Sequence, residues 1–158
     1  VQNLVLDKGA MRVVVVNVPD VSKTPFAYSQ PESTQGLIGQ MTARFNQQLA
    51  AGLAGTEDKV LLVDAFTISQ QQAENPENFG LTNIREIACD LAQPGNVLGS
   101  SLVCTANNLA GPADMVSRYQ FADGVHPTPY GYRLIAELVS SELVTKGWLA
   151  PSQAVTRE

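Results

Sequence analysis

A run of four valines, residues 13–16, constrains the fold of this 158-residue chain more than any other feature. The run stands inside the segment Met-Arg-Val-Val-Val-Val-Asn-Val-Pro at residues 11–19 and contains no polar residue. β-Branched residues without polar alternation are typical of a strand that is buried on both faces of a parallel sheet. Such a strand needs neighbouring strands on its edges and helices on both faces of the sheet. The run therefore predicts an α/β fold.

The segments that follow complete one crossover unit of such a fold. A second apolar run predicts a strand over 59–66, and the residues between the two strands have the apolar spacing of an amphipathic helix. Strand, helix and strand in this order form a right-handed crossover. The helix is predicted over 35–53, and its apolar row is Leu37, Met41, Phe45 and Leu49. The other predicted helices are the end of a helix over 1–10, a short helix over 67–73 and a last helix over 129–146.

Residues 75–120 differ from the rest, because Pro and Gly punctuate them and only residues 84–91 have a helical pattern. Loops of this length in compact domains are usually functional or disordered. Cys89 and Cys104 both lie in this loop. They could be two unrelated buried thiols, but a disulfide is the natural way to order such a loop, and it would indicate an oxidising compartment. Two cysteines and one distant histidine are too few for a four-ligand zinc site, so no metal is expected.

Composition narrows the class of protein. The length suits a single domain over residues 1–158, in which 150–158 are expected to form a loose tail. The net charge of −5 and the lack of a basic stripe argue against nucleic acid as a partner. No apolar run approaches the roughly 20 residues of a membrane-spanning helix. These observations leave two classes of protein, a globular enzyme and a globular binding domain.

The single histidine of the chain, His126, lies three residues after Asp123. Pro127 favours an extended backbone at His126, while Thr128 and Pro129 have the residue types of a helix N-cap and first helical position. Aspartate and histidine therefore share a tight turn in which the carboxylate could hold one imidazole nitrogen and leave the other free as a base. The simpler interpretation is a capping aspartate beside a surface histidine.

A catalytic site of this type needs a nucleophile in addition to a base and an acid. The chain contains no Gly-x-Ser-x-Gly turn, and Ser22, Ser29 and Ser33 lack the glycine neighbours of an exposed nucleophile. Ser100 and Ser101 follow Gly99, which is only a weak signal. No residue of this chain is therefore assigned as the nucleophile.

Four sequence blocks resemble one enzyme family. The segment Asp-Gly-Val-His-Pro-Thr at residues 123–128, followed by an amphipathic helix, resembles the last block of the SGNH (GDSL-type) esterases and lipases. Residues 9–25, 63–66 and 75–83 resemble the strands and loops that precede that block. The resemblance keeps the family's order over nearly the whole chain, and residues 119–121 are similar to the secreted and autotransporter esterases of this group.

The resemblance implies the C-terminal half of a flavodoxin-like, three-layer α/β/α hydrolase domain. The Gly-Asp-Ser, glycine and Gly-x-Asn-Asp blocks of the family are absent, so the remaining strands, the nucleophilic serine and the oxyanion hole are expected from an N-terminal segment or a second chain. His126 would be the general base and Asp123 its orienting partner in ester hydrolysis without a cofactor. The candidate substrate-pocket residues are Phe79, Gly80, Val125 and Pro127.

The same resemblance implies an ester or lipid substrate and a secreted, periplasmic or cell-surface location. This chain by itself would be inactive, because it holds only two members of the triad. The alternative is a domain that has kept the C-terminal half of the fold for binding or assembly and does no catalysis.

Overall fold

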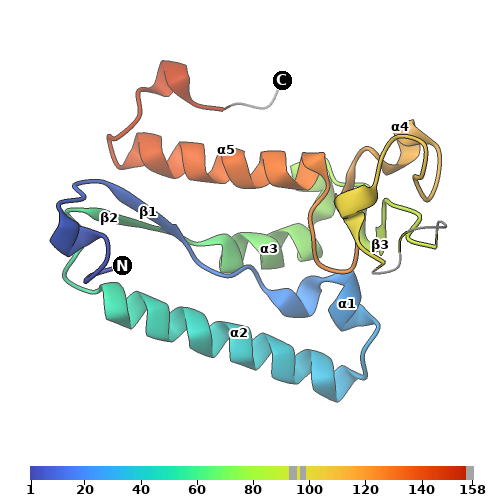
Figure 1. The fold of residues 1–158 in the computed structure, drawn as a ribbon, viewed down its shortest axis with the longest axis horizontal. Coiled ribbons are helices and arrows are strands. Elements are labelled where there is room, and N and C mark those ends of the chain that lie inside the picture. Colours follow the sequence, from blue (N-terminus) through green and yellow to red (C-terminus); the bar gives the residue numbers. More distant parts are fainter. Residues whose placement is uncertain (93–95, 97–98, 156–158) are drawn as a thin grey trace.

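The computed structural model describes residues 1–92, 96 and 99–155, and these form an α/β fold (Figure 1). Its strands are β1 (Val13–Val16), β2 (Val60–Val63), β3 (Asn83–Ile87) and β4 (Tyr119–Phe121). Its α-helices are α1 (Pro25–Tyr28), α2 (Glu32–Leu53), α3 (Ala65–Glu74), α4 (Ala113–Val116) and α5 (Pro129–Thr145). Short 3₁₀ turns complete the chain: η1 (Leu6–Lys8), η2 (Val21–Lys23), η3 (Pro76–Phe79), η4 (Ser101–Val103) and η5 (Pro151–Gln153).

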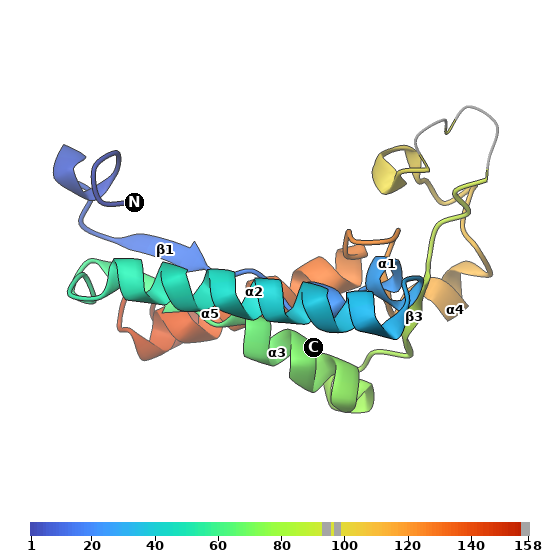
Figure 2. The ribbon, with the colours of Figure 1, turned by 90° about the horizontal axis from the view of Figure 1, so that it is seen from below.

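The two long helices cover opposite faces of the sheet that β1 and β2 form. The strands are parallel and in register from Val13 opposite Val60 to Val16 opposite Val63. Figures 1 and 2 show α2 on one side of this pair and α5 on the other. The predicted parallel α/β fold is therefore confirmed, as a three-layer arrangement whose described middle layer is two strands wide.

The valine run is buried less completely than its sequence predicts. Val13 and Val15 pack with Leu49, Leu53 and Val60 in a core between the sheet and α2. On the other face, the Val14 and Val16 side chains are 38% and 41% exposed, so the prediction of burial on both faces is wrong for the described chain. The reason is that α5 packs over β2, and within the described residues β1 pairs only with β2.

The apolar row of α2 is likewise exposed. Leu37, Met41 and Phe45 are all more than half exposed, whereas the sequence predicts that they face a core. The buried positions of α2 include Asn46, whose side chain bonds both the N–H and the C=O of Val18, at 2.9 and 2.7 Å. Only the C-terminal end of the row, at Leu49, reaches the core. One face of α2 thus has no packing partner among the residues that the structure describes.

A second parallel pair, β3 and β4, lies at the opposite end of the molecule from residues 1–10 (Figure 2). The helix predicted over 84–91 is wrong, because residues 83–87 form β3 instead. β4 supplies the partner that makes this segment a strand, and it follows more than thirty residues later in the chain. A strand whose pairing depends on such a distant and short partner leaves little periodic signal in its own sequence.

Both ends of the chain differ from expectation. Residues 1–10 contain only the turn η1, which Gly9 ends with a φ of 96°, rather than the end of an α-helix. At the other end, η5 follows α5, and the N–H of Val155 donates to the Ser140 hydroxyl at 2.8 Å. The last three residues of the expected tail, 156–158, lie outside the described residues. Among the described helices, none combines the length and hydrophobicity needed to span a membrane.

Candidate active site

The turn between β4 and α5 carries Asp123 and His126, and backbone hydrogen bonds close it on itself. The N–H of Ala122 donates to the carbonyl of His126 at 2.8 Å, and the N–H of Thr128 donates to the carbonyl of Gln120 at 2.9 Å. The segment after the histidine therefore runs back antiparallel to the strand before the aspartate, with Phe121 opposite Pro127. This hairpin-like closure fixes the distance between Asp123 and His126.

Thr128 anchors the start of α5 to β4. Its hydroxyl accepts the N–H of Gly131 at 3.0 Å, which confirms the predicted N-cap, and donates to the carbonyl of Tyr119 at 2.6 Å. Gly131 lets the first turn of the helix approach the strand closely, since a Cβ there would lie 2.6 Å from the carbonyl oxygen of Gln120. Thr128 thus holds the start of α5 against β4. Because Thr128 lies two residues after His126, this anchor also fixes the backbone from which the histidine side chain extends.

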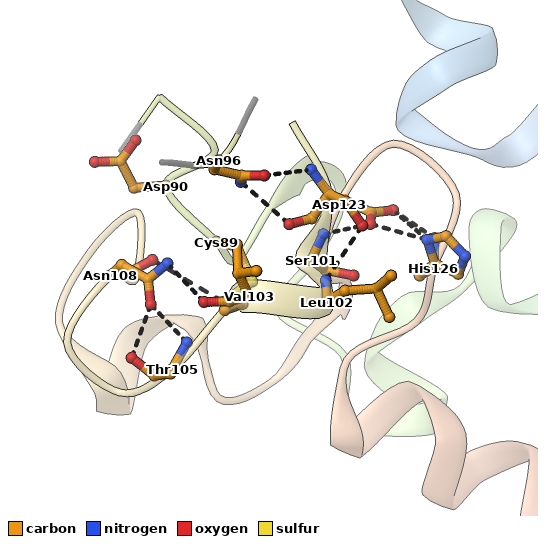
Figure 3. Close-up of a disulfide and its surroundings, with 12 residues drawn as sticks. Cys89, Asp90, Asn96, Ser101, Leu102, Val103, Thr105, Asn108, Asp123 and His126 are labelled. Atoms are coloured by element: carbon orange, nitrogen blue, oxygen red, sulfur yellow. Dashed lines mark hydrogen bonds and ion pairs between the residues drawn. A yellow bond between two sulfur atoms is a disulfide. The ribbon is translucent and has the colours of Figure 1, made fainter. Parts of the chain in front are cut away.

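The imidazole of His126 lies against the carboxylate of Asp123 (Figure 3). The Nδ1 atom is 3.0 Å from Oδ1 and 2.9 Å from Oδ2. This geometry fits a tautomer in which Nδ1–H donates to the carboxylate and the Nε2 lone pair is free. The structure thus shows the contact between carboxylate and imidazole that the Asp-x-x-His spacing predicts.

Asp123 is buried and is held in its ionised form. Its carboxylate accepts the backbone N–H groups of Val125, His126 and Ser101, at 3.0, 2.8 and 2.9 Å. Burial by itself would raise the pKa of Asp123, but the hydrogen bonds from the Ser101 hydroxyl and from these three N–H groups outweigh it. The pKa of Asp123 therefore lies well below its ordinary value, and the carboxylate stays negative beside the imidazole.

His126 presents its other ring nitrogen to solvent. Its side chain is 54% exposed, whereas that of Asp123 is 5% exposed. Nε2 makes no hydrogen bond to any residue that the structure describes, so it is free to accept a proton from an approaching hydroxyl group. A buried anion behind an exposed imidazole is the arrangement that a general base requires, because the anion stabilises the imidazolium that proton transfer creates.

The two serines with a weak sequence signal do not face Nε2. Ser100 caps η4 by accepting the N–H of Leu102 at 3.3 Å. Ser101 binds the Asp123 carboxylate, and Figure 3 shows it on a different side of that carboxylate from the His126 imidazole. Sequence reasoning missed this contact of Ser101, since no residue type marks a backbone N–H that serves as a donor.

Two cavities border the turn. One of about 370 Å³ lies between α3 and α5 and is lined by Val125 and Pro127. The other, of about 600 Å³, is lined by His126 and Pro127 together with η4 and the disulfide. The structure thus places two of the four predicted pocket residues at cavities beside the histidine.

Phe79 and Gly80, the other two predicted pocket residues, line neither cavity. They lie instead against the side of α5. The Tyr130 hydroxyl donates to the carbonyl of Phe79 at 2.8 Å, and a Cβ at Gly80 would lie 2.5 Å from that hydroxyl. They are therefore in contact with the second residue of α5 rather than with the histidine.

The cysteine pair is joined. Cys89 and Cys104 form a disulfide with a Cα–Cα distance of 5.9 Å, at the end of β3, and it ties the loop that contains η4 to that strand. The described part of the chain holds no cluster of three or more His, Cys, Asp or Glu side chains that could bind a metal ion.

Comparisons with known proteins agree on one group. The sequence model of the GDSL-like lipase/acylhydrolase family matches residues 1–139. The chain is 30% identical over 145 residues to the esterase EstA of Pseudomonas aeruginosa, and equally to that of Pseudomonas putida. It is 27% identical over 137 residues to a GDSL esterase/lipase of Arabidopsis thaliana. These alignments cover 88% and 82% of this chain, but only 20% of each Pseudomonas protein and 36% of the plant protein.

Proposed function

This chain belongs to the GDSL-like lipase/acylhydrolase family, and we propose that it contributes Asp123 and His126 to a Ser-His-Asp triad that hydrolyses carboxylic esters. The observation that carries the proposal is the contact between His126 Nδ1 and the buried Asp123 carboxylate, at 2.9 and 3.0 Å, with Nε2 left exposed. The names of the relatives, esterase and esterase/lipase, support the same reaction class.

In this mechanism His126 moves one proton in each half-reaction. As a serine oxygen attacks the ester carbonyl carbon, Nε2 takes the hydroxyl proton, and it gives that proton to the departing alcohol when the acyl-enzyme forms. In the second half, Nε2 takes a proton from water as the water attacks the acyl group, and returns it to the serine as the acid leaves. The Asp123 carboxylate stabilises the imidazolium in both halves.

We infer that the serine and the oxyanion donors come from a part of the full-length protein outside this chain. Ser100 and Ser101 are engaged elsewhere, in capping η4 and in binding the Asp123 carboxylate. Two apolar surfaces also lack a partner within the described residues: the row Leu37, Met41 and Phe45 on α2, and the face of β1 that carries Val14 and Val16. The chain spans about one fifth of the length of the Pseudomonas relatives. The remaining four fifths of those proteins are long enough to contain a segment that carries the serine and covers these surfaces.

We assign the substrate to the cavity of about 600 Å³ that His126 borders. Its apolar lining includes Leu102, which is 87% exposed and whose side chain extends toward His126 in Figure 3. An acyl or alkyl chain in this cavity would lie beside the nitrogen that moves the proton, and burial of such a chain stabilises binding roughly in proportion to its apolar area. We therefore propose that the substrate is an ester with an apolar acyl or alkyl chain.

The disulfide supports an extracytoplasmic location. Disulfides persist in oxidising compartments such as the periplasm and the cell exterior, and thiols in the cytosol are kept reduced. The disulfide joins cysteines 15 residues apart in the sequence, next to the proposed site, and it would be reduced in such a cytosolic environment. We therefore propose that the protein works outside the cytoplasm.

The proposal is tested by ester turnover in the full-length polypeptide that contains this chain, with p-nitrophenyl butyrate as the substrate. His126→Ala is expected to lower kcat by about 10⁴-fold or more, because it removes the proton acceptor. The matched control is Ser141→Ala, at an exposed position on α5 whose hydroxyl bonds the carbonyl of Leu138. The 158-residue chain by itself is expected to show no turnover. Full activity of His126→Ala with a normal circular dichroism spectrum would refute the assignment.

A further inference from the structure

The two oxygens of the Asp123 carboxylate are held by different parts of the chain. Oδ1 accepts the N–H groups of Val125 and His126, which belong to the same turn. Oδ2 accepts the N–H of Ser101, which lies 22 residues earlier in the sequence, in η4. Figure 3 shows Ser101 and His126 approaching the carboxylate from different sides. Among the residues that the structure describes, only Ser101 connects the carboxylate to a distant segment.

The bond to Oδ2 decides which way the carboxylate plane faces. The terminal torsion of an aspartate is broad, so a carboxylate held at Oδ1 alone can rotate about its Cβ–Cγ bond. Rotation would move Oδ2 away from Nδ1 of His126, which now lies 2.9 Å from it. A second donor at Oδ2 restricts that rotation and keeps both oxygens facing the imidazole.

The disulfide determines where Ser101 lies. The N–H of Cys104 donates to the carbonyl of Ser101 at 2.9 Å, so the cysteine closes the 3₁₀ turn that Ser101 begins. Its disulfide partner, Cys89, donates its own N–H to the carbonyl of Ala122 at 3.1 Å. Ala122 precedes Asp123, so a closed circuit runs from the aspartate through the disulfide to Ser101 and back to the carboxylate. The disulfide thus fixes the position of η4 relative to Asp123, whose carboxylate Ser101 contacts.

We propose that Ser101 is a positioning residue that orients the Asp123 carboxylate toward His126, and that the Cys89–Cys104 disulfide keeps Ser101 in place. The catalytic consequence rests on the proposed function, whereas the positioning is a property of this chain by itself. The two are therefore tested separately.

The positioning is tested in the full-length polypeptide that contains this chain, by a pH titration of the Asp123 carboxyl carbon, followed by NMR. Ser101→Pro removes both the N–H and the hydroxyl. The backbone of Ser100, at φ −107° and ψ 144°, already has the extended conformation favoured before proline, and Ser101 is the first residue of η4, so the main chain accepts the substitution. The ring Cδ takes the place of the amide hydrogen and therefore displaces Oδ2 of Asp123 from its 2.9 Å contact. Ser101→Ala removes the hydroxyl alone. The matched control is Ser141→Ala, which removes an exposed hydroxyl on α5 that donates to the carbonyl of Leu138.

The wild-type carboxyl is expected to stay ionised at about pH 3, below the ordinary pKa of an aspartate. In Ser101→Pro the pKa of Asp123 rises toward that ordinary value of about 3.9, so its titration becomes visible. Ser101→Ala gives a smaller rise, and Ser141→Ala matches the wild type. The double variant Cys89→Ser/Cys104→Ser is expected to behave like Ser101→Pro. Variants that keep the wild-type circular dichroism spectrum but also titrate like the wild type would overturn the proposal.

The catalytic consequence is tested by ester turnover in the full-length polypeptide. Ser101→Pro is expected to lower kcat by about 10- to 100-fold, because it misplaces the base. Ser101 also lines the assigned substrate cavity, so kcat is measured at saturating substrate, where a change in substrate binding does not contribute. A variant with an altered titration but unchanged kcat would refute the catalytic part alone. A wild-type protein without esterase activity would instead refute the proposed function and leave the titration result standing.

Discussion

The hydroxyl of Thr128 ties the start of α5 to β4, and its removal gives the sharpest stability prediction. Its oxygen caps the helix by accepting the N–H of Gly131, and its proton is donated to the carbonyl of Tyr119, both in a side chain that is 3% exposed. Loss of a threonine N-cap costs about 1 kcal/mol of unfolding free energy. Loss of a buried hydrogen bond costs about 1 kcal/mol more.

Two substitutions separate these contributions from packing. Thr128→Val keeps the shape of the side chain and loses both bonds, so we expect it to destabilise the fold by about 2 kcal/mol. Thr128→Ser keeps both bonds and loses one buried methyl group, which costs about 1 kcal/mol. Thr128→Ala loses all three contributions, or about 3 kcal/mol.

The assay is urea unfolding of the oxidised chain, followed by far-UV circular dichroism at constant pH. Changes in the midpoint at a constant slope convert directly into unfolding free energies. For a chain of this length, about 2 kcal/mol corresponds to a decrease in Tm of about 4–8 °C. The reasoning is refuted if Thr128→Val is as stable as the wild type, or if Thr128→Ser is the more damaging of the two.

Three further predictions concern the same region. Gly131→Ala should destabilise the fold by about 1–3 kcal/mol in the same urea assay. The reason is that its Cβ would lie 2.6 Å from the carbonyl oxygen of Gln120 and 2.9 Å from Cβ of Pro127. The control is Gly52→Ala, where a Cβ meets open space. Asp123 should make the fold sensitive to acid: because its folded pKa is depressed, its stabilising contribution is complete above the ordinary value of about 3.9 and is lost as the pH falls from there toward the folded pKa. Asp123→Asn should therefore flatten the decrease in stability over this acid range, and an unchanged pH profile would contradict the assignment of the low pKa. Leu102→Ala, in the full-length polypeptide, should lower kcat/KM for p-nitrophenyl octanoate by about 10-fold relative to the acetate, because it shortens the apolar lining next to His126; equal losses for both esters would exclude the cavity as the chain-binding site.

Local sequence patterns predicted those elements whose stabilising contacts are close in the chain. The Thr128 cap, the helix that it begins and the Asp123–His126 turn depend on residues within a few positions of one another, so residue types and spacing are sufficient. The valine strand and its partner β2 belong to the same crossover unit, and the parallel pairing between them follows from their apolar composition.

Distant contacts limited the rest. Residues 83–87 have no strand pattern of their own and become β3 because β4 lies beside them, so the sequence favoured a helix over 84–91 instead. The exposure of Leu37, Met41 and Phe45 also could not be read from their spacing, since an apolar row indicates which face needs a partner but not whether one is present.

The site divides in the same way. The sequence by itself determined the contact between Asp123 and His126, because an aspartate and a histidine three residues apart in a proline-stiffened turn lie close together. Only the tertiary structure decided what holds the Asp123 carboxylate in place and what surrounds the imidazole. The N–H of Ser101 reaches the carboxylate through a loop that the disulfide has folded back, and the cavity beside His126 is built from that same loop. A backbone donor has no residue type to reveal it, and its position depends on where the chain returns in space.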